Sequence, residues 1–304
     1  MANVALIFPG QGVQKVGMGK EFYETSPEAR AIFDQAESVI GSGFKKVVFE
    51  GPQETLTSTA YCQPAILTMS IAALKAFEAH PKYKNINVRF TAGLSLGEYS
   101  ALSAAGVLSF VDTLKLVRAR ASFMEEAAKK AKGAMAAVIG FDAGKLKEIC
   151  AATGAEVANF NSKDQIVITG HADKIAAACE AIKAASGKVI LLEVSGAFHS
   201  SLMRPAADQF VSVVNDITLH PGAIKVISNV NALPHEKVEQ IRSNLVLQIT
   251  SSVQWVASVE YMMAQGISDF IEIGPGKVLR GLIRKIDPNA RVVNIEKPED
   301  VLAF

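Results

Sequence analysis

The fold is decided by residues 91–99, which read Thr91-Ala92-Gly93-Leu94-Ser95-Leu96-Gly97-Glu98-Tyr99. A short strand-like run, residues 87–90, precedes this stretch, and the helix formers of residues 100–105 follow it. The pattern G-x-S-x-G between a strand and a helix predicts a nucleophile elbow, a tight turn that exposes a serine hydroxyl. The two glycines remove side chains that would clash with the neighbouring backbone. The alternative is that Ser95 only caps the helix.

The helix that follows the turn adds to the chemistry expected there. The amide of Leu96 lies at the start of this helix, where unpaired N–H groups and the helix dipole favour negative charge. We therefore expect Ser95 to act as a nucleophile on a carbonyl group. The Leu96 amide would stabilise the oxyanion that the attack creates.

The composition is that of an ordinary soluble protein. The chain has 304 residues, 49% hydrophobic and 20% charged, enough for one large domain or two unequal ones. A net charge of +1 gives no general attraction to nucleic acid or to an anionic membrane. Three cysteines without metal-ligand spacing suit reduced thiols. No apolar stretch reaches the roughly 18 residues of a membrane span. We expect a cytoplasmic protein, or one of an organelle stroma or matrix if a transit peptide has been removed.

The order of elements predicts an α/β fold. Residues 4–8 read as a buried strand that ends in a glycine-rich loop. This loop fits neither nucleotide motif, because Lys15 and Met18 stand where a dinucleotide fingerprint and a P-loop need glycine and lysine. Helices are expected over 27–40 and from Gln63-Pro64 to about residue 80. Further expected elements are helices over 110–131, 202–216, 253–265 and after residue 276, and strands over 224–227 and 269–273.

From residue 133 the pattern changes to short alternating elements in the order β-α-β-β-α-β. This order predicts a ferredoxin-like unit. We expect a larger α/β-hydrolase-like subdomain with a short parallel sheet, formed by residues 1–131 and 199–304. The smaller subdomain, residues 132–198, would be inserted into it.

Two further side chains are candidates for the same site. Arg120 has apolar neighbours at helical spacing, so its guanidinium needs an anionic partner. That partner could be a substrate carboxylate, although an internal ion pair or a snorkelling side chain would also account for it. His199 lies in a loop of small residues, 195–201, where it could be a structural residue. Because a serine nucleophile needs a base, we interpret His199 as that base.

A basic stripe is predicted on the helix after residue 276. It consists of Lys277, Arg280 and Arg284, with an apolar face opposite formed by Val278, Leu279, Leu282, Ile283 and Ile286. The stripe could receive a phosphate-bearing ligand or an acidic protein. More often, such a stripe is only a solvated helix face.

With these residues placed, the chain resembles the malonyl-CoA:acyl carrier protein transacylases of fatty acid synthesis over nearly its full length. The serine motif alone would be weak, but the matching stretches are specific in combination. They are residues 8–12 (Phe-Pro-Gly-Gln-Gly), residues 93–99 with the serine, Arg120 twenty-five positions later, residues 196–200 around the histidine, Gln248 ahead of residues 253–255, and residues 272–279.

The resemblance implies a role for each matching residue. Ser95 would be the nucleophile, His199 the base, and the side-chain carbonyl of Gln248 would hold the imidazole where a hydrolase uses a carboxylate. The backbone amides of Gln11 and Leu96 would form the oxyanion hole.

The resemblance also implies the acyl group. Arg120 would pair with the malonyl carboxylate, and Phe198 is similar to members that prefer malonyl over branched methylmalonyl. The chain departs from the family at Leu94, where many members have histidine before the serine. We expect catalysis to survive this departure, because that position carries none of the reactive groups.

The implied reaction is a ping-pong transfer from malonyl-CoA to the phosphopantetheine thiol of acyl carrier protein. It requires no metal and no other cofactor. Two alternatives remain open from the sequence. A serine thioesterase would use the same elbow, and a non-catalytic module would only hold the carrier protein through the basic stripe.

Overall fold

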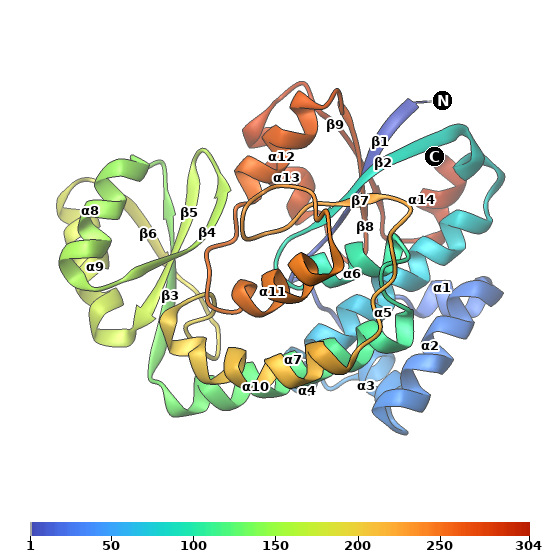
Figure 1. The fold of residues 1–304 in the computed structure, drawn as a ribbon, viewed down its shortest axis with the longest axis horizontal. Coiled ribbons are helices and arrows are strands. Elements are labelled where there is room, and N and C mark those ends of the chain that lie inside the picture. Colours follow the sequence, from blue (N-terminus) through green and yellow to red (C-terminus); the bar gives the residue numbers. More distant parts are fainter. Residues whose placement is uncertain (1) are drawn as a thin grey trace.

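The computed structural model describes residues 2–304, which form two sheets and their covering helices (Figure 1). The larger sheet has the order β7-β2-β1-β8-β9, and every neighbouring pair is parallel. Its strands are β1 (Ala2–Phe8), β2 (Ile86–Gly93), β7 (Lys225–Val226), β8 (Asp269–Ile273) and β9 (Arg291–Ile295). The predicted parallel sheet is therefore confirmed, with β1 at its centre.

The smaller sheet is antiparallel and has the order β4-β5-β3-β6. It comprises β3 (Gly133–Ile139), α8 (Ala143–Thr153), β4 (Glu156–Ser162), β5 (Gln165–His171), α9 (Ala172–Ala184) and β6 (Lys188–Leu191). This is the expected β-α-β-β-α-β unit, and it lies to one side of the larger sheet, with α8 and α9 on its outer side (Figure 1). The subdomain limits at residues 132 and 198 stay a prediction.

Helices cover both faces of the larger sheet, because side chains alternate across each strand. Leu6 and Phe8 pack with apolar side chains of α2 (Pro27–Ile40), α5 (Thr59–Ala79) and α7 (Phe110–Lys130). Ala5 and Ile7 pack with those of α12 (Trp255–Ala264) and α13 (Val278–Ile286). The remaining helices are α1 (Lys20–Thr25), α3 (Phe44–Glu50), α4 (Gln53–Thr57), η1 (Pro81–Asn85), α6 (Gly97–Ala104), η2 (Ser201–Met203), α10 (Arg204–Asp216), α11 (Val238–Gln248) and α14 (Pro298–Ala303).

Two local expectations are wrong. Helix α5 begins at Thr59 rather than at Gln63-Pro64, and Pro64 lies inside it. Because proline has no N–H, Pro64 leaves the carbonyl of Ala60, in the first turn of α5, without its usual partner in the helix. On α13, Val278 was expected on the apolar face, but it is 50% exposed, because it is the first residue of the helix and lies beyond the neighbouring core.

Candidate active site

The turn between β2 and α6 has the tight strand-to-helix geometry that the G-x-S-x-G pattern predicted. Ser95 has a φ of 53°, a left-handed conformation that is rare for a residue with a side chain. A Cβ added to Gly97 would lie 2.1 Å from the carbonyl oxygen of Phe8, and one added to Gly93 would lie 2.6 Å from the Gly97 Cα. Only glycine allows these backbones to approach so closely. The turn therefore holds the Ser95 hydroxyl at the carboxyl edge of the larger sheet.

His199 reaches this hydroxyl from a distant part of the chain. Its Nε2 lies 2.7 Å from the Ser95 Oγ, and its Nδ1 lies 2.8 Å from the backbone oxygen of Gln248. A carbonyl oxygen can only accept, so the imidazole donates from Nδ1 and keeps Nε2 free to accept the serine proton. This arrangement fits a general base that activates a nucleophile.

The prediction for Gln248 is wrong in one atom. The backbone oxygen, and not the side-chain carbonyl, holds the imidazole. Gln248 is the last residue of α11, where carbonyl groups have no partner within the helix, so its oxygen is free to accept from His199. The Gln248 side chain has another role. Its Oε1 accepts from Arg120 (3.2 Å), and its Nε2 donates to Glu98 (2.6 Å) and to the Ser95 carbonyl (3.1 Å).

Arg120 projects from α7 into the same site and is 1% exposed. Its guanidinium donates to Gln63 Oε1 at 2.8 Å and to Ser95 Oγ at 3.0 Å, and it lies 5.4 Å from the centre of the Tyr99 ring. Its Nε has no hydrogen-bond partner. Within residues 2–304 no carboxylate forms an ion pair with it, so neither the internal ion pair nor the snorkelling arginine is present. Burial lowers the pKa of Arg120, and the nearby Tyr99 and Glu98 groups oppose that effect.

A cavity of about 470 Å³ opens over the Ser95 hydroxyl, between the two sheets. Its lining includes Gln11, Leu96 and Phe198 together with the reactive side chains. Among the hydrogen bonds of residues 2–304, none uses the amide of Gln11 or Leu96, so both N–H groups are available as the expected oxyanion hole. Leu94, the departure from the family pattern, lines the same cavity.

The basic stripe lies outside this cavity. Lys277 and Arg284 are exposed, whereas Arg280 is partly buried and its guanidinium lies 3.4 Å from the Asn294 side-chain oxygen. None of the three is among the residues that line the cavity. The structure thus brings together every other predicted site residue but not these three, and their contact with a carrier or with CoA stays a prediction.

Three buried polar residues beside the site are not among the residues predicted from the sequence. Gln63 on α5 accepts from Arg120. Asn229 accepts from the Ser95 amide, and Glu98 accepts from Gln248 and from the main-chain N–H of Asn229. Glu98 had a local signal, because it stands three positions after Ser95 inside the decisive stretch. Asn229 lies 134 positions from Ser95 and had none.

No helix within residues 2–304 combines the length and the apolar character that crossing a bilayer requires. In the same part of the chain, no group of three or more His, Cys, Asp or Glu side chains is placed to hold a metal ion. Cys62, Cys150 and Cys179 are free and buried, and burial raises the pKa of the Cys62 thiol to about 12. Packing is therefore sufficient to explain this cysteine.

Comparison with known proteins agrees with this geometry. The model of the acyl transferase domain family matches residues 5–296, so the chain belongs to that family of enzymes. The malonyl CoA-acyl carrier protein transacylase of Bacillus subtilis is 43% identical, over 99% of this chain and 96% of its own. The crystal structure of the Clostridium perfringens protein of the same name has a TM-score of 0.94 and 36% identity, covering 99% of this chain and 96% of that one.

A third relative was solved with a partner. A type II PKS acyl-carrier protein in complex with its malonyl-transacylase includes a chain that matches with a TM-score of 0.94 and 34% identity, over 99% of this chain and 98% of that one. The resemblance seen in the sequence is confirmed by these relatives.

The pH dependence of acylation tests the environment of His199. Burial, and secondarily the charge of Arg120, lower its pKa from an ordinary 6.5 to about 4. The imidazole therefore stays neutral as the pH falls through 6.5 and loses its basic form only near pH 4. We expect kcat/KM for acylation of Ser95 to be level from pH 8 to about pH 5 and to fall below that. Stopped-flow acylation across this range measures it.

The variant Arg120→Gln removes the positive charge that helps to lower the pKa of His199. The fall of kcat/KM on the acid side of the pH profile should therefore occur at a higher pH. Below pH 6.5 the unfolded chain binds a proton at His199 that the folded protein does not bind. The free energy of unfolding therefore decreases as the pH falls from 6.5 towards 4. The folded fraction is therefore checked by circular dichroism at each pH. An acid limb centred at or above pH 6.5 in the unaltered protein would contradict this assignment.

Proposed function

We propose that this protein transfers a malonyl group from malonyl-CoA to the phosphopantetheine thiol of acyl carrier protein, through a malonyl ester of Ser95. The observation that carries the proposal is one hydroxyl with two neighbours. The Ser95 Oγ lies 2.7 Å from the Nε2 of a neutral histidine and 3.0 Å from the guanidinium of Arg120. These two contacts support the proposal that His199 is the base and Arg120 the carboxylate receptor beside one nucleophile.

In the first half-reaction the Ser95 oxygen attacks the thioester carbonyl. Its proton passes to His199 Nε2 as the new C–O bond forms, and the amides of Gln11 and Leu96 stabilise the oxyanion. The C–S bond then breaks, and the imidazolium returns the proton to the sulfur of the departing CoA. In the second half-reaction the carrier thiol attacks the ester, and the same groups act in reverse order. The electrons balance without a metal or a redox cofactor.

Arg120 is proposed to select malonyl over acyl groups without a carboxylate. A guanidinium meets a carboxylate through two parallel hydrogen bonds, and its only partners within residues 2–304 are neutral groups and an aromatic ring. Phe198, which lines the cavity, is proposed to restrict branched acyl groups such as methylmalonyl.

Hydrolysis is the principal rival on this elbow. In serine hydrolases the catalytic histidine usually donates a hydrogen bond to an aspartate or glutamate. Here a main-chain carbonyl takes that place, and it only orients the ring, which is all that the proposed transfer requires.

We place the reaction in the cytoplasm, which agrees with three unpaired cysteines. We also divide the chain into a catalytic subdomain, residues 1–131 and 199–304, and an inserted subdomain, residues 132–198. Neither nucleic acid nor a membrane has a part in the reaction.

A covalent adduct tests the proposed intermediate. After incubation with malonyl-CoA, we expect intact-protein mass spectrometry to show one malonyl group, and peptide mapping to place it on Ser95. The adduct should vanish in Ser95→Ala and should pass to added carrier protein. Rapid release of free malonate without an acceptor would identify a hydrolase instead. Binding of the carrier protein without any adduct would instead indicate a non-catalytic docking module.

Substitution of Arg120 tests the carboxylate receptor. Arg120→Ala also removes a hydrogen bond to the nucleophile, so some loss is expected with every acyl group. We expect the ratio of kcat/KM for malonyl-CoA to that for acetyl-CoA to fall by about 100-fold, the equivalent of about 3 kcal/mol from two charge-assisted bonds. Arg118→Ala, on the exposed side of the same helix, should leave the ratio unchanged. Equal losses for both acyl groups would remove Arg120 from substrate selection.

Charge reversal tests the proposed carrier contact of the basic stripe. Acyl carrier proteins are expected to meet Lys277, Arg280 and Arg284 with acidic side chains. Replacing the two exposed residues, Lys277 and Arg284, by glutamate should slow transfer to the carrier while acylation by malonyl-CoA stays normal. The two half-reactions are measured separately, at low and high salt. Equal effects on both steps would place the docking surface elsewhere.

A further inference from the structure

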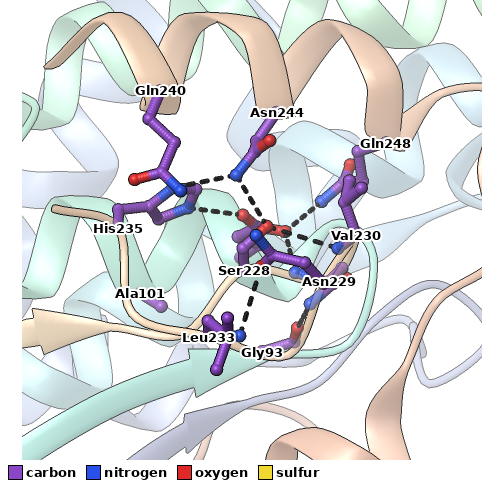
Figure 2. Close-up of polar contacts among 12 residues, drawn as sticks. Gly93, Ala101, Ser228, Asn229, Val230, Leu233, His235, Gln240, Asn244 and Gln248 are labelled. Atoms are coloured by element: carbon purple, nitrogen blue, oxygen red, sulfur yellow. Dashed lines mark hydrogen bonds and ion pairs between the residues drawn. The ribbon is translucent and has the colours of Figure 1, made fainter. Parts of the chain in front are cut away.

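Asn229 binds both ends of the serine turn. Its side-chain oxygen accepts from the Ser95 amide at 2.6 Å, and its side-chain nitrogen donates to the Gly93 carbonyl at 2.7 Å. The residue is 1% exposed and lies in the segment that follows β7 (Figure 2). One carboxamide thus closes the loop across residues 93–95. It holds Ser95 in the left-handed conformation that the free chain would avoid.

Glu98 holds Asn229 and Gln248 in place from the other side of the turn. Its carboxylate is completely buried on α6. One oxygen accepts hydrogen bonds from the main-chain N–H of Asn229, at 3.0 Å, and from Gln248 Nε2, at 2.6 Å. Gln248 in turn supplies the carbonyl that orients His199. A single carboxylate therefore links the turn that carries the nucleophile to the residue that orients the base.

A second layer supports Glu98. His235 Nε2 lies 2.9 Å from the other carboxylate oxygen, and the side chain is 2% exposed. The Asn244 side-chain nitrogen lies 3.4 Å from His235 Nδ1 and 3.2 Å from the Ser228 hydroxyl. Figure 2 shows these side chains coming from α11 and from the loop after β7 to the same point. Because Asn244 donates to Nδ1, the imidazole proton lies on Nε2 and is donated to Glu98.

The Gln248 side chain also separates two buried charges. Its Oε1 accepts from the Arg120 guanidinium, and its Nε2 donates to the Glu98 carboxylate. The amide therefore connects the cation to the anion without letting them touch. A direct ion pair would occupy the guanidinium, whereas this arrangement stabilises it and leaves its remaining N–H groups for a ligand.

We propose that Glu98 and Asn229 are positioning residues for the acyl transfer, which hold the Ser95 turn and the Gln248 carbonyl in register so that hydroxyl and imidazole meet. The inference rests on the proposed function for its substrate, but not for the reactivity of the serine. Neither residue touches the substrate in this scheme. Their loss should lower the rate of the covalent step and leave binding of malonyl-CoA nearly unchanged.

Two variants separate geometry from charge. Asn229→Ala removes the clamp across the turn without removing a charge. Glu98→Gln removes the charge, and its amide can still accept from Asn229 and Gln248 and donate to His235. The imidazole then changes tautomer, and Asn244 must turn its side-chain oxygen toward Nδ1 to accept from it. The matched control is Glu272→Gln. Glu272 is also completely buried, and its carboxylate also accepts three N–H donors, from Leu279, Arg280 and Asn294.

The reactivity of Ser95 is measured with an alkyl fluorophosphonate, which forms an O–P bond with the serine and releases fluoride. This probe needs neither malonyl recognition nor a carrier protein. We expect Asn229→Ala and Glu98→Gln to slow labelling about 10- to 100-fold, because a displacement of the order of 1 Å costs that much. In the same variants kcat for malonyl transfer should fall by a similar factor with little change in KM. The double variant should be little slower than the slower single variant, because the two residues act as a unit.

The controls separate the possible failures. Rates are normalised to the folded fraction from thermal unfolding, and Asn229→Ala serves alone if Glu98→Gln does not fold. Glu272→Gln should lose stability but label at the normal rate. Labelling of both site variants at the normal rate, or an equal loss in Glu272→Gln, would overturn the positioning role. If the unaltered protein is labelled on Ser95 but does not accept malonyl, the proposed function fails while this inference stands.

Discussion

The close approach of the serine turn to the end of β1 is the constraint on which the site depends. Gly97 lies against the Phe8 carbonyl, and a side chain at this position would force the two apart. Because β1 and β2 are neighbouring parallel strands, their carboxyl ends meet at one edge of the sheet. The loop after β1 and the helix after β2 therefore present the amides of Gln11 and Leu96 to the same space. The position of the proposed oxyanion hole follows from sheet topology and from glycines rather than from any reactive side chain.

The second organising feature is a buried cation whose partners are neutral. Isolated charges in a protein interior cost several kcal/mol, and Arg120 offsets this through hydrogen bonds to Gln63, Ser95 and Gln248. The unpartnered Nε leaves this solvation incomplete. A ligand that brings its own carboxylate completes it, and one without a carboxylate does not. The proposed selectivity for malonyl would thus come from the hydrogen bonds that the buried guanidinium lacks in the free protein.

The sequence predicted those parts of the site that local pattern determines. The glycine spacing around Ser95 and the apolar surroundings of Arg120 are local, and both identified the geometry correctly. The Gln248 error has a different origin, because a motif gives the residue but not which of its atoms is used, and the free carbonyl depends on where α11 ends. Asn229 is held by tertiary contacts across more than a hundred positions, which no spacing rule encodes. Likewise Pro64 predicts a helix start, but the surrounding packing extends α5 beyond it.

The small sheet is joined to the site through its edge. Two main-chain hydrogen bonds connect β4 with Val253, from Val253 N to Ala158 O and from Phe160 N to Val253 O. Val253 lies five residues after Gln248, whose carbonyl orients the imidazole. A tilt of the small sheet would move Val253 and, through the short connection to Gln248, the carbonyl that binds the imidazole of His199. Chimaeras that exchange the small sheet between relatives need to carry residues 248–253 with it, or the graft will bring a new pocket wall and a misaligned histidine together.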